Sequence, residues 1–248
     1  MQQETQYCIY NPSTECFSHD LSPWLRKAGI NGNPERVFID RNKNLWVKVC
    51  GGDLYYYNPR SGSKANFPIG KGHYGMEGDV GVQSFATYGK STVAVTNRGH
   101  LICFDAEKKR VSWVSDHVAK ATKAANKDYR IYIDSKGNYW TFGAGRCFIY
   151  IQKLKRWFDS LPSMLRSLGY SGIDDNVIVW DVLEDADGNM MVATDHNGLY
   201  VMDNEKREIY NYSHDKSNES SLSDFTLVRL YRTDDGQIWI GTYTGGVN

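Results

Sequence analysis

The stretch that decides the fold closes the chain: VRLYRTDDGQIWIGTYTGGVN, residues 228–248. On both sides of its Asp-Asp-Gly sequence, apolar residues recur at every second position: Val228, Leu230, Ile238 and Ile240. This period of two predicts two strands, each with one buried face. Gly236 tolerates the positive φ that a tight hairpin turn requires. We therefore expect a β-hairpin whose Trp239 lies in the core of a sheet.

The same unit recurs along the chain. Its turn-to-Trp segment starts at residues 40, 87, 134, 185 and 233, at spacings of 47, 47, 51 and 48. A second landmark, an apolar strand that closes with Asn, Asp or Gln, ends at residues 11, 58, 105, 152 and 203. Two landmarks that keep step indicate a tandem repeat.

Each repeat has room for four short strands, which is typical of a β-propeller blade. The sequence thus predicts an all-β fold, a β-propeller of four-stranded antiparallel blades. It comprises about five blade equivalents, as four whole blades and two terminal halves. The expected repeats within one domain, 1–248, are 1–19 (half), 36–68, 82–115, 129–159, 177–213 and 226–248 (half). We expect this array to be part of a larger propeller, although the two halves could instead join into a fifth blade.

Within a blade, the strands are called a, b, c and d. Aromatic residues of strand d are expected to pack between neighbouring sheets: Phe17, Phe67, Trp113 and Tyr210. Long linkers join each strand d to the next strand a, and residues 119–127 and 161–169 within them favour short helical turns. Long loops on a rigid scaffold often carry binding sites.

The composition excludes several classes of partner. The 29 basic and 29 acidic residues cancel, so no charge field indicates nucleic acid or an anionic membrane. The chain has no apolar run long enough to span a bilayer, and its first residues lack the pattern of an export signal. The five cysteines show no metal-ligand spacing and are expected to be mostly small apolar strand residues.

Catalytic and metal-binding motifs do not emerge either. The two Ser-His-Asp triplets, which begin at Ser18 and Ser213, place adjacent residues on opposite faces of a strand, so they cannot form a catalytic relay. The six histidines lack the spacing of metal ligands. We therefore predict no catalytic residue, no metal and no cofactor.

A candidate ligand surface follows from position within the blade. In propellers, the b–c turns and d–a loops share one face, and the d–a loops are expected to bring His73, Tyr74 and Tyr170 there. The b–c turns carry Arg98, Arg146, Asp195, His196 and Tyr243, while Trp180 is expected near an inner strand. Planar polar groups and rings suit a polar ligand such as an oligosaccharide. The alternative is that these are ordinary exposed turn residues.

The last repeat resembles a known family. Its residues 213–215, 220–224, 235–242 and 245–246, with the run Asp-Gly-Gln-Ile-Trp-Ile-Gly-Thr, are similar to the two-component regulator propeller repeat. In other repeats the Gly-Thr pair after Trp is replaced, for example by Lys48-Val49. The resemblance implies the periplasmic sensor region of a bacterial hybrid two-component histidine kinase, which often responds to glycan breakdown products. The family's kinase and phosphorelay modules would then lie in sequence not present here.

The favoured hypothesis is a non-catalytic, ligand-sensing propeller that recognises a glycan outside the cytoplasm. A protein–protein interaction scaffold is one alternative, and a propeller glycan lyase or hydrolase is another. The expected partners are an oligosaccharide and either a second copy of the chain or further propeller blades. No nucleic acid and no membrane contact by this segment are expected.

Overall fold

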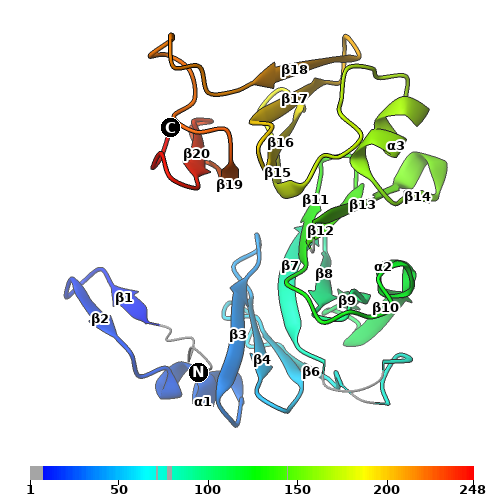
Figure 1. Ribbon diagram of the computed structural model, residues 1–248. Helices are drawn as coiled ribbons and strands as arrows, with labels where there is room; N and C mark the ends of the chain where they lie inside the picture. Colours follow the sequence, from blue (N-terminus) through cyan, green and yellow to red (C-terminus); the bar gives the residue numbers. More distant parts are fainter. Residues whose placement is uncertain (1–7, 71, 77–79, 144) are drawn as a thin grey trace. The chain divides into compact units, whose positions relative to one another are not determined.

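The strands of this computed structural model pair antiparallel with the strands next to them in sequence (Figure 1). The structure describes residues 8–70, 72–76, 80–143 and 145–248. The internal contacts divide the chain into two units: unit 1, residues 1–115, and unit 2, residues 116–248.

Unit 1 holds two four-stranded sheets, one hairpin and a helix. The first sheet is β3 (Pro34–Ile39), β4 (Leu45–Val49), β5 (Leu54–Tyr57) and β6 (Lys64–Phe67). The second is β7 (Val82–Tyr88), β8 (Ser91–Thr96), β9 (Leu101–Asp105) and β10 (Arg110–Ser115). The hairpin is β1 (Ile9–Asn11) with β2 (Cys16–Ser18), and the helix is α1 (Ser22–Ala28).

Unit 2 repeats this plan. Its first sheet is β11 (Arg130–Ile133), β12 (Tyr139–Gly143), β13 (Arg146–Ile151) and β14 (Arg156–Phe158). Its second is β15 (Val179–Glu184), β16 (Met190–Thr194), β17 (Leu199–Asp203) and β18 (Glu208–Tyr212). The closing hairpin is β19 (Leu227–Arg232) with β20 (Ile238–Thr242). The helical segments are α2 (His117–Ala121), η1 (Gln152–Leu154) and α3 (Leu161–Ser167).

Four antiparallel sheets of four consecutive strands confirm the predicted fold class, an all-β propeller with four whole blades and a two-stranded half towards each end. The expected strand c at the start of the chain is β1, although Tyr7 lies outside the described residues. That residues 1–248 form one propeller, itself part of a larger one, stays a prediction.

A buried carboxylate holds the turn between strands a and b. Asp134 Oδ1 accepts the backbone N–H groups of Lys136 and Asn138 at 3.0 and 2.8 Å. Its Oδ2 accepts Asn138 Nδ2–H at 2.8 Å and Trp140 Nε1–H at 3.0 Å. Because Asp134 is 3% exposed and Trp140 is 2% exposed, these bonds form away from water. The turn therefore fixes the position of the indole ring.

The same arrangement recurs in the first blade, where Asp40 accepts from the backbone and side chain of Asn44 and from Trp46 Nε1–H at 3.1 Å. The Trp46 ring lies 5.5 Å from the Phe104 ring of the next sheet in unit 1. In unit 2, Trp140 belongs to a buried cluster shared by the two sheets and α3. The anchored indoles thus form the contact between consecutive blades within each unit.

Several expectations about single residues were wrong. Trp239 is 47% exposed rather than in a core, and Thr233 occupies the place that Asp134 holds in the third blade. A threonine side chain has a single oxygen, so it cannot accept the four hydrogen bonds that the Asp134 carboxylate accepts from its turn and from Trp140. Among the strand d aromatics, Phe67 is buried as predicted, whereas Phe17 and Tyr210 are 65% and 37% exposed.

The linkers are more helical than predicted. Helix α3 confirms the helical turn expected at 161–169, and α2 overlaps only the start of the one expected at 119–127. Helix α1 was not expected, although Pro23 in its first turn and Gly29 at its C-cap, with φ of 74°, are ordinary helix boundary signals.

We predict that Trp140→Ala and Trp239→Ala differ sharply in their effect on stability. Removing the buried Trp140 ring leaves a cavity and should lower the free energy of unfolding by about 3–5 kcal/mol. Removing the half-exposed Trp239 ring should cost about 1 kcal/mol or less. Urea denaturation of both variants would measure the difference. Equal losses would contradict the assignment of Trp140, and not Trp239, to a blade core.

Candidate functional site

Three predicted residues lie close together at the b–c end of unit 2. His196 Nδ1 is 2.6 Å from Asp195 Oδ1 in the turn between β16 and β17. The Thr226 hydroxyl donates to Asp195 Oδ1 at 3.3 Å, and the His196 backbone N–H donates to Thr226 Oγ1 at 3.3 Å. The Tyr243 N–H donates to the Thr226 carbonyl oxygen at 2.9 Å. Thr226 therefore joins Asp195, His196 and Tyr243.

His196 has a left-handed backbone conformation, with φ of 65°. For a residue with a Cβ atom this conformation costs roughly 1–2 kcal/mol. Its side chain is nevertheless 72% exposed, and the Tyr243 ring is 76% exposed. Strain of this kind is often kept where a side chain must be presented in a defined direction.

Asp224 ties the d–a loop to the turn that follows β20. Its Oδ2 accepts the Thr244 hydroxyl at 2.6 Å and the Thr244 N–H at 2.9 Å, while Oδ1 accepts the Thr226 N–H at 3.0 Å. These hydrogen bonds lower the pKa of Asp224 to about 2, and the bond from the Thr244 hydroxyl has the largest effect. The ionised carboxylate therefore holds Tyr243, which directly precedes Thr244.

Trp180 lies on strand a of the fourth blade, as predicted, and is 41% exposed. The register of β15 with β16 shifts between Val179 and Asp181, so that Trp180 is the extra residue of a β-bulge. Bulges occur where a strand must redirect a side chain.

The remaining predicted residues make other contacts. Arg146 donates to the Ala121 carbonyl oxygen at 3.2 Å, and its guanidinium lies 4.8 Å from the centre of the Phe148 ring. Arg98 is half-buried in the β8–β9 turn of unit 1. Tyr170 was expected on the b–c side, but it is 3% exposed and its hydroxyl donates to Asn204 Oδ1 at 3.0 Å. Asn204 follows β17, at the opposite end of the sheet, so that expectation was wrong.

The sequence analysis missed Arg130, Asp181 and Arg229, which lie on the strands a of unit 2. Asp181 Oδ2 accepts the Leu230 N–H at 3.1 Å and is 3.7 Å from Arg229 Nη1. Arg130 Nη1 donates to the Trp180 carbonyl oxygen at 3.3 Å. A signal was available, because each of the three stands four residues before the first residue of its a–b turn.

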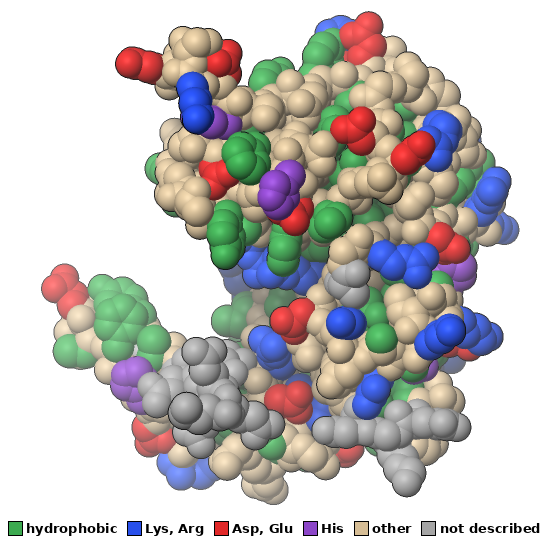
Figure 2. Space-filling model, viewed as in Figure 1, with side chains coloured by type: hydrophobic (Ala, Val, Ile, Leu, Met, Phe, Trp, Pro, Cys, Tyr) green, Lys and Arg blue, Asp and Glu red, His purple; other side chains and the backbone are tan. Residues whose placement is uncertain are grey.

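Burial dominates the electrostatics of Asp181 and Arg130. It raises the pKa of Asp181, against the opposing effects of the Leu230 N–H and the Arg229 guanidinium. Burial, followed by repulsion from Arg229, lowers the pKa of Arg130. In Figure 2, hydrophobic, histidine and acidic side chains gather over the part of unit 2 that holds β15, β19 and β20.

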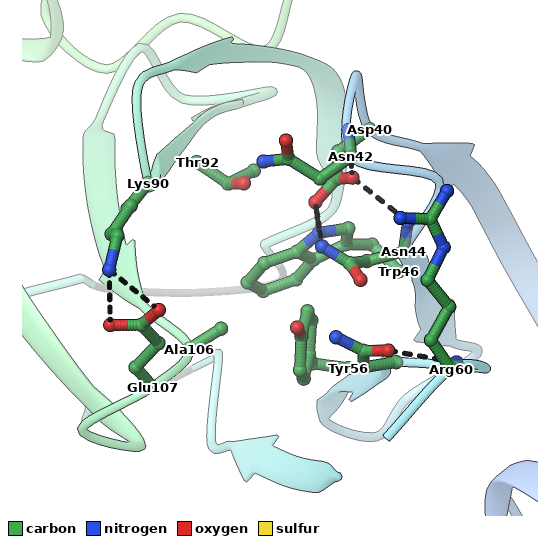
Figure 3. A pocket seen from close by; sticks show the side chains of 11 residues that line it. Asp40, Asn42, Asn44, Trp46, Tyr56, Arg60, Lys90, Thr92, Ala106 and Glu107 are labelled. Atoms are coloured by element: carbon green, nitrogen blue, oxygen red, sulfur yellow. Dashed lines mark hydrogen bonds and ion pairs between the residues drawn. The ribbon is translucent and has the colours of Figure 1, made fainter. Parts of the chain in front are cut away.

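A second candidate is a cavity of about 280 Å³ in unit 1, at the end of the sheets that carries the a–b and c–d turns. Figure 3 shows Trp46 and Tyr56 within it, the ion pair Lys90–Glu107 on one side and Arg60 on the other. Its lining mixes amide, hydroxyl and charged groups. It lies at the opposite strand ends from the predicted b–c surface, so the sequence analysis missed it.

The described ranges hold neither a metal-binding cluster nor a membrane-spanning helix. No group of three or more His, Cys, Asp or Glu side chains there could hold a metal ion. The helices found there are all too short or too polar to cross a bilayer.

Comparisons with known proteins confirm the resemblance noted for the last repeat. Residues 222–244 match the family model described as two component regulator propeller. This match includes Asp224, Thr226, Arg229 and Tyr243. None of the curated proteins matches the chain.

Solved structures are similar in fold. The extracellular domains of two putative hybrid two-component systems of B. thetaiotaomicron align at 18% identity with TM-scores of 0.57 and 0.60. These alignments cover 90% and 96% of this chain but 28% and 29% of those chains. PorZ of Porphyromonas gingivalis, a surface component of the type-IX secretion system, aligns at 14% identity with a TM-score of 0.56, over 88% of this chain and 32% of PorZ. The chain thus spans less than a third of the length of each.

We predict that Asp224→Asn lowers the melting temperature at pH 7, since the Asn amide has only one acceptor oxygen and cannot accept the hydrogen bonds of both Thr244 and Thr226. The folded-state pKa of Asp224 lies below its ordinary value of 3.8. The stability it contributes is therefore fully present above about pH 5 and lost as the pH falls from 3.8 towards 2. Thermal melts of wild type and variant should converge over that range. A gap that persists unchanged to pH 2 would contradict the prediction.

Proposed function

We propose that this chain is a non-catalytic, ligand-sensing propeller segment of a bacterial two-component signalling protein, exposed to the periplasm, and that its ligand is an oligosaccharide. The observation that carries the proposal is the family match of residues 222–244, because that segment supplies Tyr243 and the loop anchor Asp224 to the candidate site.

The chemistry of the b–c end of unit 2 supports a sugar ligand. Tyr243 and Trp180 present exposed rings, on which the apolar face of a sugar can stack. His196 and Asp195 supply a donor and an acceptor for hydroxyl groups. A few polar groups placed around aromatic surface are typical of ligand sites.

A binding role also agrees with the state of the carboxylates. Asp195 accepts from Thr226, and Asp224 accepts from Thr226 and Thr244. Carboxylates held in this way position loops, whereas glycoside hydrolysis uses a pair of carboxylates placed across a scissile bond. In this proposal the signal passes to further modules of a longer protein, through a second copy of the chain or through additional propeller blades.

Calorimetric titration with a panel of soluble oligosaccharides tests the proposal. We expect at least one to bind wild type without being cleaved, and Tyr243→Ala to weaken that binding about tenfold or more, since stacking on a ring of this kind is worth roughly 0.5–1.5 kcal/mol beyond its buried area. Tyr231→Ala is the matched control, because Tyr231 is 64% exposed on the same hairpin but near the opposite turn.

Binding that Tyr243→Ala and Tyr231→Ala weaken equally would remove the site assignment. Cleavage of a labelled oligosaccharide, abolished by a single carboxylate substitution, would refute the non-catalytic part of the proposal. A scaffold role would be supported instead if no saccharide bound and the chain captured a partner protein through these loops.

A further inference from the structure

One position of strand a is polar in every blade. It stands four residues before the start of the a–b turn and is occupied by Arg36, Gln83, Arg130, Asp181 and Arg229. In β3, β15 and β19 the β-bulge lies directly before it, whereas in β7 the bulged residue is Gln83 itself. All five strands would gain from an apolar residue here if the position only filled a core. The polar residues therefore need another explanation.

In unit 1 the two side chains at this position form a hydrogen bond with each other. Arg36 Nη2 donates to Gln83 Oε1 at 3.1 Å, between the neighbouring strands β3 and β7. Such a lateral hydrogen bond gives the guanidinium a neutral partner.

Unit 2 is different because two guanidinium groups flank one carboxylate, on the neighbouring strands β11, β15 and β19. Both carboxylate oxygens of Asp181 accept hydrogen bonds from the backbone: Oδ1 accepts the Val182 N–H at 3.0 Å and Oδ2 accepts the Leu230 N–H at 3.1 Å. Its contact with Arg229 is a 3.7 Å ion pair, longer than a hydrogen bond. The carboxylate therefore neutralises the two cations incompletely.

The guanidinium donors are largely unused. Arg130 is half-buried, and among the described residues its side chain makes one hydrogen bond, to the Trp180 carbonyl oxygen at 3.3 Å. Within the same ranges, Arg229 makes no side-chain hydrogen bond. Each guanidinium has five N–H donors. Asp128 affects Arg130 by charge alone, without an ion pair between them in the described structure.

We propose that Arg130 and Arg229 form an anion-binding site, and that the ligand of unit 2 carries a carboxylate or sulfate group, as an acidic saccharide does. Planar guanidinium groups match the two oxygens of such an anion. Arg130 is half-buried, which strengthens its interaction with an anion, whereas the Arg229 side chain is 60% exposed and open to a ligand. The exposed Trp180, whose carbonyl oxygen already accepts from Arg130, supplies an adjoining ring for the rest of the ligand. The saccharide part of this inference rests on the proposed function. The anion-binding part rests on Arg130 and Arg229 alone.

Two probes separate the anion from the saccharide. The first is inorganic sulfate or glucuronate, added at constant ionic strength with chloride as the reference. We expect it to raise the melting temperature of the wild-type chain and to leave that of Arg130→Gln unchanged. The second is a pair of oligosaccharides of equal length, one of glucuronate or galacturonate units and one of neutral units.

The acidic oligosaccharide should bind wild type more tightly than the neutral one, and Arg130→Gln or Arg229→Gln should weaken its binding by about tenfold to a hundredfold. Arg130→Lys keeps the charge but not the planar fork, so it should restore binding only in part. Arg166→Gln is the matched control. Arg166 lies on α3 and forms an exposed ion pair with Asp175, so this variant removes the same charge and should leave oligosaccharide binding unchanged.

The outcomes distinguish the two proposals. Equal affinity for acidic and neutral oligosaccharides, unchanged in Arg130→Gln, would overturn the anion site while leaving the sensor proposal intact. Stabilisation by sulfate that requires Arg130, without binding of any oligosaccharide, would support the anion site while the saccharide proposal fails. Equal stabilisation of wild type and Arg130→Gln by sulfate would overturn the anion site. A circular dichroism spectrum of each variant checks that it is folded.

Discussion

The first and third blades depend on one buried interaction, the carboxylate of the a–b turn that accepts four hydrogen bonds. In the third blade, Asp134 satisfies two backbone N–H groups of its turn and, with its other oxygen, the side chains of Asn138 and Trp140. An ionised group is costly to bury unless its acceptors are filled, and here they are. The charge thereby fixes the largest ring of the core, on which the next sheet of the unit packs.

This anchoring lies at one end of the strands and leaves the other end free to vary. The b–c turns and the loops that precede strands a hold the strained His196, the exposed Tyr243 and the bulged Trp180. The backbone N–H groups of His196 and Tyr243 donate to Thr226, and Asp224 accepts from Thr226 and Thr244. Thr226 and Asp224 are both buried. A rigid sheet with a polar, well-anchored loop end is a common basis for binding sites.

The charged residues of unit 2 also differ between the a–b end and the b–c end of the strands. Glu184, near the a–b end of β15, accepts from the Ser135 hydroxyl at 2.6 Å and from its N–H at 2.7 Å. That carboxylate joins two blades. Asp181, three residues earlier in the same strand, accepts backbone N–H groups instead and leaves most donors of Arg130 unused. Glu184 is thus a structural carboxylate near the a–b end of β15, whereas the Arg130 guanidinium, on β11, has donors available to a ligand.

The sequence by itself determined the repeat, the four-stranded blades and the resemblance of the last unit, because period-two alternation and turn residues act locally. It also identified Asp195, His196, Tyr243 and Trp180 as turn or inner-strand residues. Only the tertiary structure decided that Trp140 is buried while Trp239 is half-exposed, and that Tyr170 points to the other end of its sheet. It also brought together Arg130, Asp181 and Arg229, which are separated by 51 and 48 residues. Burial and charge contacts of this kind depend on neighbouring sheets, which pattern within a single strand does not specify.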